Sequence, residues 1–327
     1  MHKTVMVTGG AGYIGSHTVL ALQDRGFNIV VVDNLSTGSR KLVPDGVDFY
    51  HVDISQSDEI EAIIKKHNIE AIIHFAGSII VPESVENPLK YYLNNTVNSQ
   101  KLIDIAIKTN VKNFVFSSTA AVYGIPEQSI VNENTTLMPI NPYGASKLMT
   151  EQMLQDVHQA HGLNIGILRY FNVSGADHQG RSGQAMPNAT HLIKVACEVM
   201  TKKRAHIEIF GTNYPTDDGT CVRDYIHVTD LAKAHLVVLD KLFCDGGKVI
   251  TNCGYGRGYS VREVLECAEK VLGSTFEKIE SPRRAGDPPM LVSDNHYLTQ
   301  NLGWQPEYND LFEIIQTAFN WEKKLNL

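Results

Sequence analysis

Short apolar runs alternate with longer amphipathic stretches through the first half of the chain. We expect buried strands over residues 4–8, 28–33, 47–52, 71–75, 113–119 and 164–172. Between them, apolar positions recur at helical spacing, which predicts helices after the glycine run at 9–15, over 58–67 and 88–108, and from Pro142 onward. Strands that alternate with helices in this way predict an α/β fold, with a Rossmann-type doubly wound parallel sheet.

The alternation breaks down after Asn172. We expect a loop over a cleft at 177–187, a helix capped by Asn188 and running to about Lys203, and a short strand at 207–210. The turn at 214–219 carries acids that we expect to be solvated, and Ser260 has capping-box spacing before a helix that ends near Gly273. The sequence therefore predicts a smaller C-terminal lobe over 176–327, with some later segments returning to the domain of residues 1–175.

Composition narrows the class of protein. The 327 residues are 43% hydrophobic and 20% charged, with a net charge of −7, which argues against nucleic-acid binding. No apolar run approaches the length of a membrane span, and the N-terminus lacks a signal-peptide pattern. The five cysteines are odd in number and have no zinc spacing, so we expect reduced thiols, no metal site and a cytoplasmic location.

The first strand leads into a glycine-rich turn. Gly9, Gly12 and Gly15 permit a tight turn whose backbone N–H groups approach a pyrophosphate at the start of the next helix. The second strand ends in Asp33, whose carboxylate can bind both hydroxyls of an adenosine ribose and would repel a 2′-phosphate. Together they predict a dinucleotide site that favours NAD over NADP.

Candidate chemistry lies at Asn141–Lys147. Asn141 can cap a helix with Pro142 in its first turn, and Tyr143 and Lys147 then share one helix face. A nearby ammonium and a positive cofactor ring both favour the phenolate, which makes a tyrosine a usable base near neutral pH. Alone, this spacing is more typical of an exposed tyrosine beside a solvated lysine.

Other polar positions fall at the same end of the predicted sheet. The strand over 113–119 changes from apolar to hydroxylic at Thr119, where ligands of α/β sheets bind. Asn94 and Asn95 lie inside a predicted helix, although asparagine is a poor helix former, so each can serve a polar role.

The assembled motifs resemble those of the extended short-chain dehydrogenase/reductase family, and within it those of the enzymes that epimerise carbon 4 of UDP-hexoses. The resemblance covers nearly the whole chain in order. The matching stretches are 8–15, 32–35, 74–77, 116–124, 142–149, 168–172 and 219–228.

The resemblance implies interconversion of UDP-glucose and UDP-galactose through a 4-keto intermediate on bound NAD, in a homodimer. It implies catalytic roles for Thr119, Tyr143 and Lys147. The cofactor-binding residues that it implies are Gly9, Gly12, Tyr13, Ile14, Gly15, Asp33, Asn34, Asp53, Ile54, Phe75, Ala76, Asn94, Tyr143, Lys147 and Phe171. The substrate-binding residues are Thr119, Tyr143, Asn172, Phe210, Arg223, Arg284, Asp287 and Leu291, with Arg283 a further candidate for the pyrophosphate.

Two positions depart from the family pattern. Ile79 stands where many members carry a lysine that helps to bind the cofactor, so NAD retention can differ. Leu291 stands where members restricted to plain hexoses carry a tyrosine, and the smaller side chain leaves room for N-acetylated sugars.

Two other functions remain open from the residues. A nucleotide-sugar 4,6-dehydratase shares this scaffold. Those enzymes carry a motif that resembles Ser-Thr-Asp-Glu at the end of this strand, whereas this chain has Ala120 and Ala121 after Thr119 and lacks the two carboxyl groups. An NAD-sensing protein without catalysis would not need Thr119, Tyr143 and Lys147 together.

Overall fold

A parallel sheet of seven strands lies at the centre of the N-terminal half. The computed structural model describes residues 3–186, 189–284 and 286–325, so the predicted cap Asn188 lies outside the described residues. The strand order is β11-β7-β5-β4-β1-β2-β3, and all neighbours are parallel. The strands are β1 (Thr4–Thr8), β2 (Asn28–Asp33), β3 (Asp48–His51), β4 (Ala71–His74), β5 (Asn113–Thr119), β7 (Asn164–Tyr170) and β11 (Lys248–Cys253).

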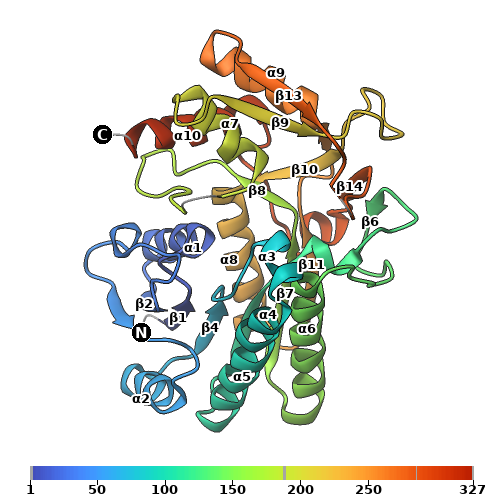
Figure 1. Cartoon of the computed structure of the whole chain (residues 1–327). Helices are drawn as coiled ribbons and strands as arrows, with labels where there is room; N and C mark the ends of the chain where they lie inside the picture. Colours follow the sequence, from blue (N-terminus) through green and yellow to red (C-terminus); the bar gives the residue numbers. More distant parts are fainter. Residues whose placement is uncertain (1–2, 187–188, 285, 326–327) are drawn as a thin grey trace.

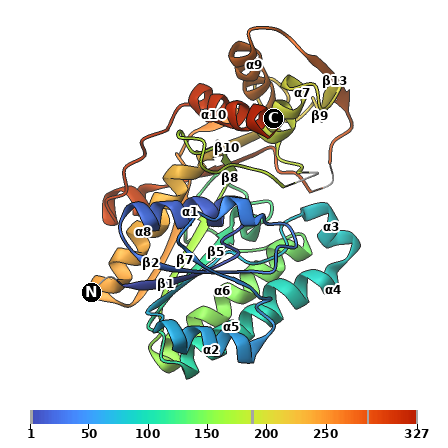
Figure 2. The same cartoon turned by 90° about the vertical axis from the view of Figure 1, so that its left-hand side faces the viewer.

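Helices cover both faces of this sheet, as the alternating pattern predicts (Figures 1 and 2). Val5 and Val7 of β1 belong to one hydrophobic cluster and Met6, between them, to another, because successive side chains of a strand point to opposite faces. The helices on the first face are α1 (Tyr13–Asp24) and α8 (Val228–Asp245), and those on the second are α2 (Ser57–His67), α5 (Asn98–Lys108) and α6 (Pro142–His161).

The helix predicted over 88–108 contains a π-helical segment. It begins after the short α3 (Val81–Glu86) and consists of α4 (Pro88–Tyr91), the π-helical η2 (Tyr92–Val97) and α5. Asn94 and Asn95 lie in η2. Single π-helical turns inside α-helices often occur at functional sites, so η2 and the neighbouring α6 are candidate parts of a functional site.

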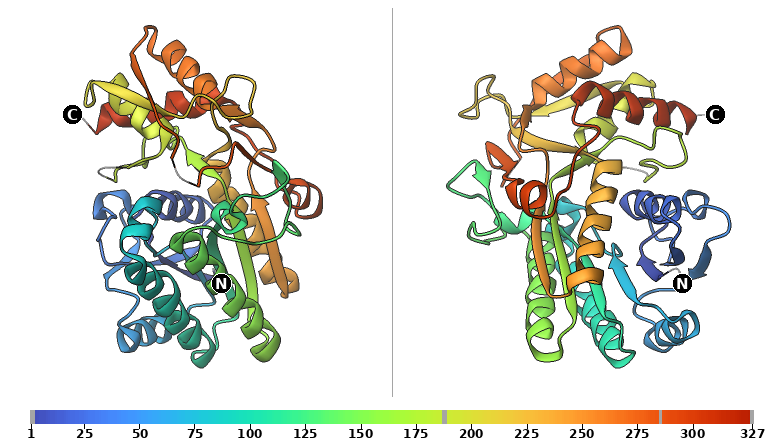
Figure 3. Two further views of the ribbon diagram at one scale, coloured as in Figure 1. Left: turned by 45° about the vertical axis from the view of Figure 1, so that its right-hand side comes forward. Right: turned by 180° about the vertical axis from the view of Figure 1, so that it is seen from behind.

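A smaller set of elements lies over the carboxyl ends of the parallel strands (Figures 1 and 3). Its larger sheet has the order β12-β10-β14-β6, with β8 also paired to β10, and β9 pairs with β13. The strands are β6 (Ile130–Val131), β8 (Asn172–Ser174), β9 (His206–Phe210), β10 (Val222–His227), β12 (Gly258–Ser260), β13 (Glu277–Ser281) and β14 (Met290–Ser293). The helices are α7 (Leu192–Met200), α9 (Val261–Leu272) and α10 (Leu311–Lys324), and the remaining short helices are η1 (Arg40–Leu42), η3 (Ala120–Tyr123) and η4 (Tyr297–Asn301).

One hydrophobic cluster extends from β1 and α8 into α7, α9 and α10, so the two parts share a core. Strand β11, late in the sequence, lies in the N-terminal sheet beside β7. The domain boundary near residue 175 therefore remains a prediction, because the hydrophobic packing continues across it. No helix within residues 3–186, 189–284 and 286–325 is long and apolar enough to cross a membrane.

The turn at 214–219 differs from the expectation that its acids are solvated. Asp217 is exposed, but the Asp218 carboxylate accepts hydrogen bonds from the backbone and hydroxyl of Thr220 and from the hydroxyl of Ser260. Ser260 also caps α9 in the predicted capping box with Glu263. Asp218 therefore fastens this turn to the start of α9. The sequence pattern could not reveal this contact because its partners lie 42 residues apart.

Candidate active site

The glycine turn after β1 packs backbone against backbone. Gly9 has a φ of +71°, and a Cβ there would lie 2.6 Å from the amide nitrogen of Ala76. A Cβ on Gly15 would lie 2.2 Å from the carbonyl oxygen of Gly9. Helix α1 starts at this turn with Gly12 as its N-cap, and its first turn holds neither a capping side chain nor an acidic residue. Its N–H groups are therefore positioned to bind an anion.

Asp33 lies next to this turn at the carboxyl end of β2. Its Oδ2 accepts a hydrogen bond from the amide of Ala11 at 2.9 Å, and its Oδ1 accepts one from the amide of Leu35 at 2.8 Å. Burial raises the pKa of Asp33. Asn34 donates to Asp53 Oδ2 at 2.6 Å, and the next residue, Ile54, is buried. The structure thus gathers these four predicted residues beside the glycine turn.

Tyr13 and Ile14 form the first turn of α1. The Tyr13 hydroxyl donates a hydrogen bond of 2.6 Å to the carbonyl oxygen of Gly175, so this phenol is already paired. The part of Tyr13 that can meet an anion is its backbone. Ile14 is partly buried against the main hydrophobic cluster.

The proposed base lies at the start of α6. Asn141 caps this helix by accepting a hydrogen bond from the amide of Gly144 at 2.9 Å, and Pro142 occupies its first position. Tyr143 and Lys147 follow one helical turn apart. The Lys147 Nζ is buried and donates to the carbonyl oxygen of Ser117 at 2.9 Å. The Thr119 hydroxyl lies near the Tyr143 phenol and lowers its pKa, so the three predicted catalytic residues meet where β5 ends.

The pKa values of these groups differ from the first expectation. Burial raises the pKa of Tyr143, and the neighbouring Thr119 hydroxyl only partly offsets this effect. Burial also lowers the pKa of Lys147 to about 8, against the opposing effect of the Glu151 carboxylate. Desolvation therefore dominates both pKa values in the chain by itself, and a stable phenolate here needs additional positive charge.

Asn95 has a larger role at this site than the sequence indicated. It is buried, and its Oδ1 accepts from the amide of Ser78 at 2.7 Å while its Nδ2 donates to the carbonyl oxygen of Ser78 and the hydroxyl of Ser146. The neighbouring Asn94 donates to the Ser78 hydroxyl at 3.0 Å. Both asparagines fix the segment that follows Phe75 and Ala76, and a Cβ on Gly77 would approach Lys147 Nζ to 3.6 Å. Their position inside a helix was the available signal.

Three of the predicted substrate residues lie on paired strands of the sheet that contains β10. Asn172 begins β8 and pairs with β10, which carries Arg223 opposite Leu291 of β14. The Arg223 guanidinium lies 3.5 Å from Asp287 Oδ1, and Asn172 donates to the carbonyl oxygen of Asp224 at 3.2 Å. The sheet register therefore brings together residues that lie far apart in the sequence.

Phe210 and Arg284 form a second pair on this side. The Arg284 guanidinium lies 3.8 Å from the centre of the Phe210 ring, a cation–π contact. Arg283 instead donates to Asn213 and lies over the ring of Tyr214. Arg283 thus holds the 211–214 turn, whereas Arg284 contacts Phe210 and Arg223 contacts Asp287.

Leu291 and Phe171 connect the predicted catalytic residues near Thr119 with the predicted substrate residues on the sheet that contains β10. Leu291 is 8% exposed and packs in a small hydrophobic cluster with Ala120 and Tyr123, against which Phe171 and Leu148 also lie. Leu291 therefore sits beside the segment that follows Thr119. Phe75, at the end of β4, packs against the ring of His235 with 4.8 Å between ring centres.

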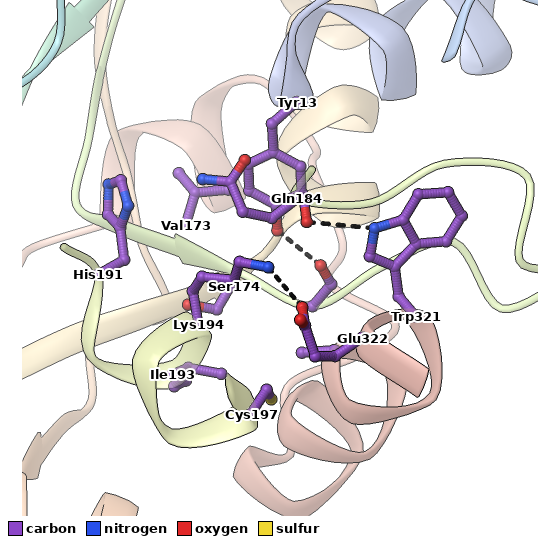
Figure 4. A pocket seen from close by; sticks show the side chains of 12 residues that line it. Tyr13, Val173, Ser174, Gln184, His191, Ile193, Lys194, Cys197, Trp321 and Glu322 are labelled. Carbon is purple, nitrogen blue, oxygen red and sulfur yellow. Dashed lines mark hydrogen bonds and ion pairs between the residues drawn. The ribbon is translucent and has the colours of Figure 1, made fainter. Parts of the chain in front are cut away.

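A separate cavity, lined in part by Tyr13, lies between α1, β8, α7 and α10 (Figure 4). A buried ion pair between Lys194 and Glu322 faces it, and Trp321 donates to the carbonyl oxygen of Gln184 at 3.2 Å. Among the residues that the structure describes, its lining does not include the catalytic trio. Trp321 and Trp304 are both buried and pack in hydrophobic clusters.

Comparison with known proteins agrees with this geometry. Residues 5–254 match the model of the "NAD dependent epimerase/dehydratase family". The chain belongs to this family. A UDP-glucose 4-epimerase from Azospirillum brasilense, also in the comparison, is 52% identical over 321 residues, which cover 98% of this chain and 92% of that protein.

Solved structures of epimerases share the whole fold. The UDP-glucose 4-epimerase from Brucella ovis, crystallised with NAD, is 43% identical with a TM-score of 0.95 and 98% of each chain covered. The UDP-Glc/GlcNAc 4-epimerase from Campylobacter jejuni is 47% identical with a TM-score of 0.86, covering 98% of this chain and 99% of that one. The predicted Rossmann-type fold is therefore confirmed for this member of the epimerase/dehydratase family.

Proposed function

We propose that this protein is a UDP-glucose 4-epimerase, an isomerase that interconverts UDP-glucose and UDP-galactose with bound NAD. The observation that carries the proposal is the meeting of Thr119, Tyr143 and Lys147 at the end of β5, next to the segment of Ala76 and Gly77 against which the glycine turn packs. The names of the relatives reported above support the same activity.

The residues around the glycine turn fit NAD. The uncapped N-terminus of α1 would hold the pyrophosphate, and the close backbone packing at Gly9 and Gly15 leaves no room for side chains there. The Asp33 carboxylate would bind the adenosine ribose and would disfavour a 2′-phosphate. When bound, NAD supplies a reversible acceptor for hydride from carbon 4 of the sugar, and its positive ring supplies the charge that Tyr143 needs.

Tyr143 moves the proton in this reaction. As phenolate, its oxygen takes the proton of the 4-hydroxyl while carbon 4 is oxidised, and it returns that proton when the 4-keto sugar is reduced from its opposite face. Thr119 donates a hydrogen bond to the oxygen at which charge develops. Lys147 stabilises the phenolate as an ammonium, so the reaction requires Tyr143 deprotonated and Lys147 protonated at the same time.

The sugar must turn over between the two steps while the nucleotide stays bound. Arg223 and Arg284 suit the pyrophosphate because guanidinium groups match its oxygens, and Asp287 and Phe210 hold the uridine. The dehydratase alternative receives no support, since Ala120 and Ala121 in η3 carry only methyl groups. Leu291 leaves space beside the sugar, so UDP-N-acetylglucosamine and UDP-N-acetylgalactosamine are further substrates in this proposal.

We also propose a homodimer that works in the cytoplasm. The five cysteines are free thiols, as a reducing compartment permits. Val85, Leu89, Leu93 and Val97 recur every four residues from α3 to η2 and are 63%, 77%, 56% and 42% exposed. Met149 of α6 is 46% exposed, and α6 packs against η2. Pairing two copies across this stripe would cover it.

The direct test is conversion of UDP-galactose by the purified chain, with UDP-N-acetylglucosamine as a competing substrate. We expect UDP-glucose to form, and we expect Tyr143→Phe to lower kcat by about 10²–10⁴-fold while NAD stays bound. Tyr50→Phe removes a remote phenol that is paired with His67 and serves as the control. Near-normal epimerisation by Tyr143→Phe, or no conversion of any UDP-sugar by the wild type, would refute the proposal.

A further inference from the structure

A buried carboxylate lies one helical turn beyond Lys147 on α6. Glu151 is fully buried, and its Oε2 accepts a hydrogen bond of 2.6 Å from Nη2 of Arg169, while Nε of Arg169 lies 3.0 Å from Oε1. The Arg169 side chain is only 3% exposed. Removing both charges from water costs several kcal/mol per ion, and a buried pair is therefore weak evidence for a role in stability.

The partners of Glu151 lead directly to the catalytic trio. Glu151 accepts a hydrogen bond from the Ser118 hydroxyl. Ser118 lies between Ser117, whose carbonyl oxygen accepts a hydrogen bond from Lys147, and Thr119, whose hydroxyl lies near the Tyr143 phenol and lowers its pKa. Glu151 therefore holds β5 at Ser118, the residue between the one that contacts Lys147 and the one next to Tyr143.

Arg169 ties the same carboxylate to the neighbouring strand. It lies on β7 opposite Ser118 in the sheet register, so one ion pair joins α6, β5 and β7. Its Nη1 donates to the Tyr123 hydroxyl and to the carbonyl oxygen of Glu133, each at 3.2 Å. Tyr123 in turn donates to Asn252 of β11 at 2.7 Å. These contacts leave the guanidinium little freedom to move.

The pair also sets the balance of charge at Lys147. The Glu151 carboxylate raises the pKa of Lys147 against the larger effect of burial, which lowers it to about 8. On β4, His74 faces the same ammonium, but burial lowers the pKa of His74 to about 3, so this ring stays neutral at working pH. Arg169 on β7 offsets the negative charge of Glu151, and the phenols nearby are those of Tyr143 on α6 and of Tyr170 on β7, whose hydroxyl forms a hydrogen bond with Ser117.

We propose that Glu151 and Arg169 are positioning residues of this active site: together they hold Ser117, Ser118 and Thr119 against α6, and they balance the charge next to Lys147. The inference rests on the proposed function, because it assigns these residues to the reaction that Tyr143 and Lys147 perform.

The two charges act on Lys147 with opposite sign, which gives the test. Glu151→Gln removes a negative charge and leaves Arg169 unbalanced, so the pKa of Lys147 falls by about one unit or more. Arg169→Met leaves the carboxylate unbalanced, so the same pKa rises. A ¹³C NMR titration of the lysine ε-carbons in the holoenzyme measures both shifts directly, with the Lys147 signal assigned by its absence in Lys147→Met.

The pH profile of kcat reports the same shifts in the reaction. The high-pH limb follows the loss of the Lys147 charge, so it moves to lower pH in Glu151→Gln and to higher pH in Arg169→Met. Ser118→Ala breaks only the contact to the strand, so kcat falls without a movement of the limb. Arg169→Lys keeps the charge and returns the limb to its wild-type position, which keeps the test open if Arg169→Met does not fold.

Glu322→Gln is the matched control. Glu322 is as buried as Glu151, with 1% of its side chain exposed, and it pairs with Lys194 far from the trio. We expect it to lower thermal stability without moving the titration or the limb. Shifts of the same sign in Glu151→Gln and Arg169→Met, or no shift in either, would overturn the inference. A wild type without epimerase activity contradicts the proposed function instead, and the NMR titration still decides between these outcomes.

Discussion

The Nζ of Lys147 donates a hydrogen bond of 2.9 Å to the carbonyl oxygen of Ser117. This bond joins α6 to the end of β5 and fixes the ammonium within the site. The ammonium also lies 4.9 Å from the centre of the Phe116 ring, which belongs to the same strand. A charged group is thus held in an environment that disfavours its charge, and this conflict has a measurable consequence.

Lys147→Met separates activity from stability. Burial lowers the pKa of Lys147 from 10.5 to about 8, so the unfolded chain binds this proton more tightly than the folded chain does. The lysine therefore costs folding free energy below pH 8, and the cost disappears as the pH rises from 8 to 10.5. We expect Lys147→Met to lower kcat by about 10²–10⁴-fold and yet to melt at or above the wild-type temperature at pH 7.

Thermal denaturation of both proteins between pH 7 and pH 10.5 checks this prediction. The advantage of Lys147→Met should shrink as the pH rises. Lys65→Met is the control, since Lys65 is exposed and pairs with Glu61 on α2. If Lys147→Met is less stable than the wild type at pH 7 and regains stability at high pH, the charge on Lys147 stabilises the folded chain, and the prediction is wrong.

Asp33→Asn should weaken the binding of NAD. The Asp33 carboxylate accepts two backbone hydrogen bonds, and an amide at this position turns one acceptor into a donor that faces an N–H group. Hydrogen bonds to charged groups contribute about 1.5–3 kcal/mol, so we expect the Kd for NAD to rise about 10–100-fold and the preference over NADP to shrink. Calorimetric titration measures both, with Asp45→Asn at an exposed position as the control. Unchanged affinity for NAD would exclude Asp33 from the cofactor site.

Leu291→Tyr should narrow the range of sugars. Leu291 packs beside Ala120 and Phe171, next to the segment that follows Thr119, and a tyrosine there would take up the space beside the sugar. We expect kcat/KM for UDP-N-acetylglucosamine to fall by at least about 10-fold, while that for UDP-glucose changes little. Parallel assays of the two substrates give this ratio. An equal loss for both sugars would mean that the side chain supports the fold and does not select the substrate.

Local sequence patterns predicted the elements that depend on neighbouring residues. The glycine turn at 9–15, the strand that ends at Asp33 and the spacing of Tyr143 and Lys147 each follow from backbone geometry within one or two elements. For the same reason the capping box at Ser260 and six of the seven strands of the parallel sheet were identified close to their observed bounds, whereas β11 was not predicted.

Contacts between distant segments were not predictable in this way. Glu151 meets Arg169 across 18 positions, Asp218 meets Ser260 across 42, and Asn172 reaches Asp224 across 52. Such pairs leave no periodic trace, because each side chain has an ordinary local neighbourhood. The pKa of Tyr143 was misjudged for a related reason. The sequence shows the spacing between Tyr143 and Lys147, but it does not show the burial that raises the pKa of Tyr143.

The most direct test of the proposed mechanism is a crystal structure of the holoenzyme with a UDP-hexose bound. The distance to measure is that from the phenol oxygen of Tyr143 to the oxygen on carbon 4 of the sugar. We expect a hydrogen bond of about 2.6–3.2 Å, with Lys147 still bonded to Ser117 beneath it. A phenol that points away from the sugar, with another group in contact with that oxygen, would contradict it.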